Sequence, residues 1–230
     1  MITPDQIRSY PLFAGLSETE LADMASHLVK RAFAKGVYLF HPGHPVLNIY
    51  LIESGMARAF FTNSRGKEFA LNLIGSYSVI GMPLIHEGQT RILGVSAVTP
   101  LVTLVLTQKD LLRIAQQSPA LLRNVNSLVD AYIQALILHV RSLVTLSVNG
   151  RLATVFLFLG RSAQDQKIKA EIDLPLSQAD LAGCIGASRG HVNRAMTHLQ
   201  KLGLIRAEGQ KIVFLDRPGL ERISEELISE

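Results

Sequence analysis

The chain has little or none of several residues on which whole classes of protein depend. Its 230 residues include one cysteine, Cys184, and no tryptophan. A single cysteine excludes an intramolecular disulfide and an iron–sulfur cluster held by several thiolates. The start of the chain also lacks the basic and then apolar pattern of a secretory signal. These absences predict a cytoplasmic protein without an iron–sulfur centre.

An apolar run without charge, ILGVSAVTPLVTLVLT at residues 92–107, is shorter than the roughly 20 residues that a bilayer-spanning helix needs. Pro100 interrupts it, and alternating Val and Leu follow. This pattern predicts two buried strands and no membrane partner.

Short apolar runs punctuated by glycine extend from about residue 33 to 108, with turn signals at HPGHP, ESG and NSRG. They predict an antiparallel β-roll or jelly-roll-like module. Short helices are expected before it, over residues 4–30, where Ser17 and Glu20 have the spacing of a capping box. The predicted fold class is therefore α+β.

A long helix is expected next, because residues 111–148 contain no glycine and only one proline, Pro119. Two apolar stripes run along it: Leu122, Val125, Val129, Tyr132, Leu136, Leu143 and Leu146 in the first, and Ile133, Ile137, Val140 and Val144 in the second. A helix with two apolar faces can pack on its own domain and on a twin, which predicts a dimer seam. The alternative is a helix packed within one chain.

The sequence VNG at 148–150 is expected to form a hinge, with Gly150 breaking the helix. Beyond it, LSQADLAGCIGASRGHVNRAMTHLQKLGLIR (176–206) predicts two short helices. Ser177 and Ser188 are suitable N-caps, and Gly186 ends the first helix. So short a connection between helices with facing apolar residues is typical of a helix-turn-helix, and LIRAEGQKIVFL adds a hairpin wing.

The polar residues of this motif suit DNA. Residues 177–211 contain five Lys or Arg against two Asp or Glu, within a chain of net charge +4. Arginine can donate to guanine O6 and N7, while serine, glutamine and free helix N–H groups suit phosphate oxygens. The predicted DNA-binding residues are Ser177, Gln178, Ser188, Arg189, Gly190, His191, Asn193, Arg194 and Thr197.

From roll to winged helix-turn-helix, about residues 12 to 215, the chain resembles the CRP/FNR family of bacterial transcription regulators. The resemblance implies three parts: a sensor domain at 1–110, a dimerisation helix at 111–148 and a DNA-binding domain at 149–230. It implies a homodimer on palindromic double-stranded DNA, a small-molecule effector and contact with RNA polymerase. Arg194 and Arg189 match family arginines, whereas Gly190 replaces the usual glutamate, so the usual half-site is not expected.

The cyclic-nucleotide members of that family carry a glutamate for the ribose and an arginine for the phosphate. Here Met82 stands in place of the glutamate and Arg91 matches the arginine, so cyclic AMP is not the expected effector. The predicted effector site comprises Ile80, Gly81, Met82, Pro83, Leu84, Arg91, Leu136 and Ile137. It favours another small effector, for example an organic acid; the alternatives are a structural roll without a ligand and a solvated Arg91.

Haem is a disfavoured cofactor. His41, His44, His86 and His139 are available as axial ligands, but HPGHP resembles an ordinary surface turn. An enzyme is not expected, because no nucleophile has a matched base and no metal-ligand spacing occurs. A ligand-binding or scaffold module without DNA binding remains an alternative.

Overall fold

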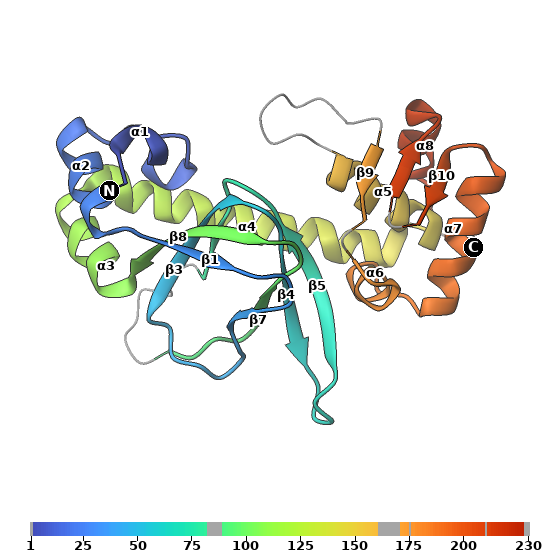
Figure 1. Cartoon of the computed structure of the whole chain (residues 1–230), viewed down its shortest axis with the longest axis horizontal. Helices are drawn as coiled ribbons and strands as arrows, with labels where there is room; N and C mark the ends of the chain where they lie inside the picture. The colour runs from blue at the N-terminus through green and yellow to red at the C-terminus, as the bar shows by residue number, and fades with distance from the viewer. Residues whose placement is uncertain (1, 82–88, 161–170, 175, 210, 228–230) are drawn as a thin grey trace. The chain divides into compact units, whose positions relative to one another are not determined.

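The computed structural model describes residues 2–81, 89–160, 171–174, 176–209 and 211–227. The chain forms two compact units, one of residues 1–68 and 72–135 and the other of residues 69–71 and 136–230. The first combines helices with two antiparallel sheets, and the second is mainly helical with a small sheet (Figure 1). The α+β fold predicted from the sequence is confirmed.

Short helices begin the first unit, as predicted: α1 (Pro4–Ile7), the 3-10 helix η1 (Pro11–Phe13) and α2 (Glu18–His27). The capping box of α2 is present, because the Ser17 hydroxyl accepts from the Glu20 amide at 3.3 Å and the Glu20 carboxylate accepts from the Ser17 amide at 2.8 Å. Hydrogen bonds from the Ser118 and Ser17 side chains lower the pKa of Glu20 to about 2.

The roll consists of two four-stranded sheets. One has the order β1-β8-β3-β6 and the other β2-β7-β4-β5. The strands are β1 (Val29–Phe33), β2 (Tyr38–Phe40), β3 (Asn48–Ser54), β4 (Ala57–Thr62), β5 (Glu68–Ile74), β6 (Val79–Ile80), β7 (Gly94–Ala97) and β8 (Leu101–Thr107). Thus the run 92–107 does contain two buried strands, β7 and β8.

Strand β3 is buried on both faces, which explains its almost continuous apolar sequence. Ile49 and Leu51 face a core shared with the N-terminal helices. Tyr50 and Ile52, which point to the other face of the strand, belong to the core of the roll. Because successive strand residues point to opposite sides, one strand joins two hydrophobic cores.

The predicted long helix is divided in two: α3 (Gln108–Gln117) precedes α4 (Pro119–Thr145). Ser118 has an extended backbone and Pro119 starts α4, because proline suits the first turn of a helix but not its interior. Among the described helices, only α4 is long and apolar enough to cross a membrane by length and composition.

Most apolar side chains of α4 remain exposed in the single chain. Leu121 and Val125 are buried in the N-terminal core, and Leu128 packs against it. Farther along, nine large hydrophobic side chains are between 39% and 70% exposed: Leu122, Val129, Tyr132, Ile133, Leu136, Ile137, Leu138, Val140 and Val144. All of these except Leu138 lie on one side of the helix by its 3.6-residue period, and these eight, here called the α4 stripe, extend over most of the helix.

The expected break at Gly150 is wrong. The chain bends at Leu146 and Ser147, and α5 (Val148–Gly160) contains Gly150 within its first turn. The Ser147 hydroxyl accepts from the Gly150 amide at 3.0 Å and so caps α5. A Cβ at residue 150 would lie 3.0 Å from the carbonyl oxygens of Ile223 and Glu226, so a larger residue there would require these carbonyl groups to shift slightly.

The second unit is completed by β9 (Glu171–Asp173), α6 (Gln178–Cys184), α7 (Arg189–Lys201), β10 (Ile205–Glu208), β11 (Lys211–Phe214) and α8 (Arg217–Ile223). The strands form an antiparallel sheet of order β10-β11-β9. Helix α5 packs against α7 and α8, and α6 packs against α7. The hairpin β10–β11 is the predicted wing.

Candidate DNA-binding and effector sites

Helices α6 and α7 are joined by only four residues, and both start at the predicted caps. The Ser177 hydroxyl accepts from the Asp180 amide at 3.1 Å, and the Ser188 hydroxyl accepts from the His191 amide at 3.2 Å. Gly186 has φ +58, a left-handed conformation that glycine adopts readily at a helix end. The predicted helix-turn-helix is therefore present.

The apolar face of α7 holds this helix in the unit. Val192, Ala195 and Leu199 are at most 2% exposed, as the spacing predicted. Leu181 and Ile185 are buried as well, at 1%. Cys184 is also buried, so it serves as a small apolar residue of the packing.

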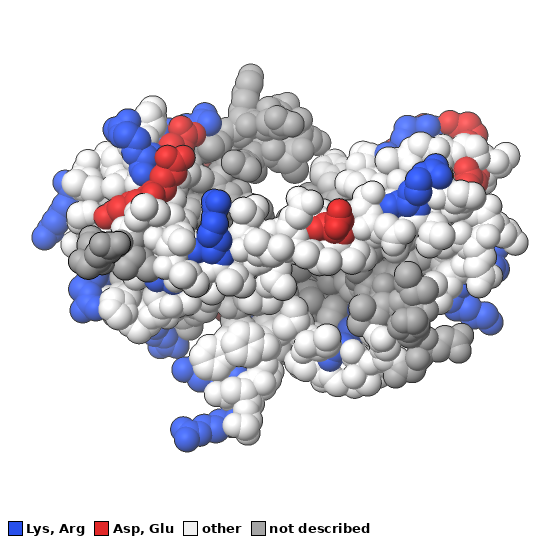
Figure 2. Space-filling model, turned by 180° about the vertical axis from the view of Figure 1, so that it is seen from behind, with Lys and Arg blue, Asp and Glu red and all other residues white. Residues whose placement is uncertain are grey.

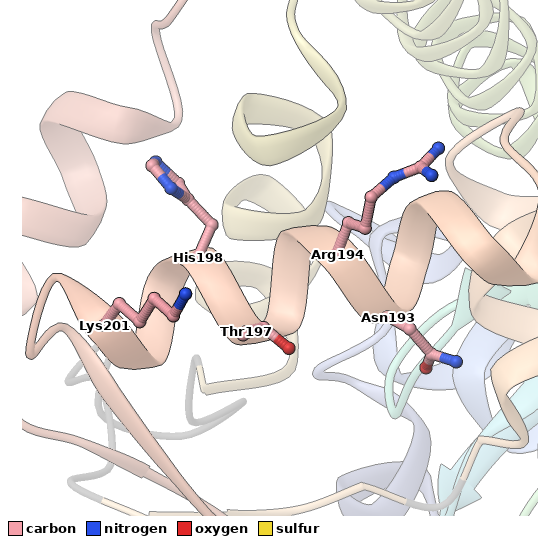
Figure 3. A pocket seen from close by; sticks show the side chains of 5 residues that line it. All are labelled: Asn193, Arg194, Thr197, His198 and Lys201. Atoms are coloured by element: carbon pink, nitrogen blue, oxygen red, sulfur yellow. The ribbon is translucent and has the colours of Figure 1, made fainter.

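The opposite face of α7 is polar and hollowed. Five side chains line an open hollow of about 390 Å³: Asn193, Arg194, Thr197, His198 and Lys201. Arg194 and His198 project on one side of the helix, and Asn193 and Thr197 project on the other (Figure 3). A helix with hydrogen-bonding side chains in two adjacent rows can contact the base edges of a DNA major groove with both rows.

Two of these residues were not predicted. His198 and Lys201 lie one and two turns beyond Arg194, toward the C-terminal end of α7. Their i+4 and i+7 spacing from Arg194 could have placed them on the same face. The prediction stopped at Thr197 because bases are usually read by the N-terminal end of such a helix.

The predicted serines are already engaged as caps. Ser177 Oγ donates to the Asp180 carboxylate at 2.7 Å, and Ser188 Oγ lies 2.8 Å from His191 Nδ1. Arg189 and Gly190 occupy the first turn of α7, where helix N–H groups have no partner within the helix. Gln178 has the equivalent position in α6. Phosphate oxygens could bind these N–H groups.

The cations of α7 differ from those of the wing. Arg206 pairs with Glu208 and Lys211 pairs with Glu171, each at 2.5 Å. Within the part of the chain that the structure describes, Arg189 and Arg194 have no carboxylate within 4.0 Å. On the face drawn in Figure 2, basic side chains are scattered among uncharged ones. Arg189 and Arg194 are therefore available to an anionic partner, whereas Arg206 and Lys211 of the wing are paired.

Arg91 is the central residue of the predicted effector site. It is only 8% exposed, so the alternative of a solvated loop arginine is wrong. Its guanidinium donates to the Gly81 carbonyl at 3.2 Å and to the Asn48 carbonyl, and it lies 4.1 Å from the centre of the Phe40 ring. Burial lowers the pKa of Arg91, and its Nε has no hydrogen-bond partner among the residues that the structure describes.

The other predicted effector residues are only partly brought together. Ile80 is buried, and Gly81, with φ +75, lies directly against the Arg91 guanidinium. Met82, Pro83 and Leu84 lie outside the described residues. The side chains of Leu136 and Ile137 belong to the exposed α4 stripe, at 52% and 61%.

The described histidines considered for haem lie on two different elements. His41 and His44 lie on the exposed turn after β2, and their ring centres are 5.4 Å apart. His139 is on α4, where burial and then the charge of Arg151 lower its pKa. His86 lies outside the described residues.

Two family models match the chain. The cyclic nucleotide-binding domain matches residues 30–118, and the Crp-like helix-turn-helix domain matches residues 150–223. These ranges correspond to the roll with α3 and to the unit that contains α6 and α7.

Relatives match over most of their length. The "cAMP-activated global transcriptional regulator CRP" of Salmonella typhimurium is 27% identical over 76% of this chain and 84% of that protein. The "Cyclic AMP receptor protein" of Thermus thermophilus is 27% identical over 87% of this chain and 90% of that protein. The structure of FixK2 from Bradyrhizobium japonicum has a TM-score of 0.77 at 18% identity and covers 88% of this chain and 99% of that one, which shows the shared fold.

A β-roll, a long helix and a winged helix-turn-helix with a polar recognition face define a DNA-binding regulator of transcription. Both halves of the architecture agree with the family models and with the relatives. The chain belongs to the CRP/FNR family of transcription regulators. Proteins of this family are DNA-binding transcription factors and not enzymes.

Proposed function

We propose that the protein is a cytoplasmic homodimer that binds a palindromic DNA site and is controlled by a small effector other than cyclic AMP. The observation that carries the dimer is the α4 stripe, where eight large apolar side chains are 39% to 70% exposed. Contiguous apolar surface of this kind marks an interaction site, and a period of three and four residues suits a second, identical helix.

In a two-fold dimer, each α7 would read one half-site. Arg189, Arg194 and Asn193 would contact base edges, because their side chains are exposed and lie on the face of α7 away from its core. Thr197, His191 and Gly190 would lie against the groove wall, and Ser177, Gln178 and Ser188 would position the helix ends on phosphates. Two such helices engage both half-sites when they lie about one DNA turn apart, roughly 34 Å.

Three consecutive segments have separate proposed roles. Residues 1–110 sense the effector, residues 111–148 form the dimer contact and residues 149–230 bind DNA. An effector would favour one arrangement of the two DNA-binding units over another by binding it more tightly. Contact of the DNA-bound dimer with RNA polymerase completes the proposal, which the relatives' description as transcriptional regulators supports.

Cyclic AMP is an unsuitable effector although several relatives are named for it. Methionine 82 has no oxygen for a ribose hydroxyl, and Leu136 and Ile137 offer no hydrogen bonds to a base. The guanidinium of Arg91 is bonded to two carbonyl oxygens and has no carboxylate partner among the described residues, so its charge is not neutralised. The site would suit a smaller and more apolar molecule with one anionic group, whose charge could neutralise Arg91.

The decisive experiment is selection of bound DNA from a random pool, with and without a small-molecule extract of cells. A two-fold-symmetric site is expected, and its enrichment should depend on the extract. Enrichment of a single half-site would contradict the dimer, and absence of any enrichment in both conditions would favour a scaffold module.

Calorimetry with cyclic AMP tests the effector separately. No heat of binding is expected at micromolar nucleotide. Micromolar binding that Arg91→Ala abolishes would overturn the proposal and would make the protein a cyclic-AMP receptor.

A further inference from the structure

The turn that follows β2 holds two histidines side by side. In His41-Pro42-Gly43-His44, the His44 amide donates to the His41 carbonyl at 3.3 Å, which closes a four-residue turn. Gly43 has φ +82, and proline before it presets the first bend. The first and last residues of such a turn lie within 7 Å of each other at Cα. His41 and His44 are those two residues.

The turn is also fixed to the roll. The Gly43 amide donates to the Arg91 carbonyl at 2.7 Å, and the Arg91 amide donates to the His44 carbonyl at 2.7 Å. Tyr38 stacks on the His41 ring with centres 4.3 Å apart and planes 28° apart. Its hydroxyl is in turn bonded to Glu68 at 2.8 Å. Both the backbone of the turn and the His41 ring are therefore held in place.

We propose that His41 and His44 form a binding site for a late first-row divalent metal ion. Their ring centres are 5.4 Å apart with an interplanar angle of 63°. Two imidazoles bound to one tetrahedral ion, with nitrogens at about 2.0 Å from the metal, have ring centres about 5 Å apart. With the His41 ring held on Tyr38, rotation of the exposed His44 side chain would bring one of its nitrogens to an ion bound at His41.

Imidazole nitrogen selects Cu²⁺, Ni²⁺ and Zn²⁺ over Mg²⁺ and Ca²⁺, which prefer oxygen. Among the described residues, no group of three or more His, Cys, Asp and Glu side chains surrounds a possible ion. The described residues therefore supply two ligands, and water or a small anion would supply others. Because so few protein ligands impose little geometry, we expect the intrinsic order of affinity for nitrogen ligands, in which Cu²⁺ binds more tightly than Ni²⁺ or Zn²⁺.

The turn lies within the proposed sensor domain and is connected there to Arg91. The backbone amide and carbonyl of Arg91 each form a hydrogen bond with the turn. Bound metal would stabilise the turn and, through it, the segment that presents the Arg91 side chain to Gly81 and Asn48. Metal binding itself does not depend on the proposed effector, so each of the two proposals can fail without the other.

The test is titration of the full-length protein with Cu²⁺, Ni²⁺ and Zn²⁺, compared with His41→Asn and His44→Asn. Both side chains are exposed, so the variants should keep the thermal melting temperature of the metal-free protein. We expect one Cu²⁺ per chain, an electron paramagnetic resonance spectrum with two nitrogen ligands, and a loss of affinity of about tenfold or more in each variant.

The matched control is His27→Asn. His27 is a partly exposed histidine of α2 whose ring lies 3.4 Å from Asp23 and 4.0 Å from Asp110, and its replacement removes one imidazole without changing the turn. The control should bind copper as the unmodified protein does. Undiminished binding in both turn variants, loss of binding in the control, or a spectrum with one nitrogen would each overturn the proposal.

Discussion

The guanidinium of Arg91 lies 4.1 Å from the centre of the Phe40 ring, inside the roll and without a carboxylate partner among the described residues. Two carbonyl oxygens and one aromatic face take the place of an anion. A cation over an aromatic face gains more when water is excluded, so this arrangement can hold the charge, although burial still lowers the pKa of Arg91. The residue is both a structural element of the roll and its only described buried cation.

Gly81→Ala tests how tightly this arrangement is packed. A Cβ at residue 81 would lie 2.4 Å from Arg91 Nη1, and φ is +75. We expect a loss of unfolding free energy of about 2 kcal/mol or more, from backbone strain together with displacement of the guanidinium. Gly66→Ala is the control, because Gly66 has φ +74 and nothing within 4 Å of its Cβ position. Urea denaturation measures both variants. An equal loss of unfolding free energy in Gly81→Ala and Gly66→Ala would show that the Arg91 side chain moves aside without destabilising the protein.

Arg194→Ala should weaken binding to the selected DNA site by about 1–3 kcal/mol and binding to random DNA very little, because an arginine on a base edge contributes to sequence discrimination. Fluorescence anisotropy with both DNAs measures the two effects. Arg217→Ala, which removes an arginine of α8 paired with Glu221 at 2.9 Å, is the control and should change neither affinity. Equal weakening on both DNAs would make Arg194 a phosphate contact.

Asn193→Ala should relax the preference for adenine at one position in each half-site, since an asparagine amide can bond adenine N6 and N7 together. Repeating the DNA selection with the variant measures this effect. The other positions of the site should keep their preferences. If the selected site is unchanged at every position, Asn193 does not read a base.

Leu136→Glu should convert the dimer to a monomer and abolish tight binding to the palindrome, because it places a charge in the centre of the α4 stripe. Gln134→Glu, two residues earlier on the exposed opposite side of the helix, is the matched control for added charge. Sedimentation equilibrium distinguishes the two states. A dimer that survives Leu136→Glu would mean that the seam lies elsewhere.

The second unit should lose stability as the pH falls below 6.5. Burial and then Arg151 lower the pKa of His139 from 6.5, so the unfolded chain binds a proton more readily than the folded one. The stabilising contribution is complete above the unfolded pKa and is lost as the pH falls through the folded pKa. His139→Gln should flatten this part of the stability profile, measured by thermal melting from pH 7.5 to 5. An unchanged slope would assign the pH dependence to other groups.

Local signals in the sequence predicted many elements correctly. Ser17, Ser177 and Ser188 are helix caps, and the glycines of HPGHP, ESG and NSRG have positive φ. These features depend on interactions between residues only a few positions apart, so the sequence alone contains them. The same holds for the period of α7, which correctly separated its buried face from its polar face.

The position of the hinge and the surroundings of Arg91 were decided only by the tertiary structure. Glycine weakens helices in general, yet Gly150 lies within the first turn of α5, where a Cβ would come within 3.0 Å of the carbonyl oxygens of Ile223 and Glu226, more than 70 residues later. Arg91 was equally compatible with a solvated loop until β2, β3 and β6 were assembled around it. Burial is a property of segments that meet in space, and the free energy of a buried charge depends on the partners that those segments supply.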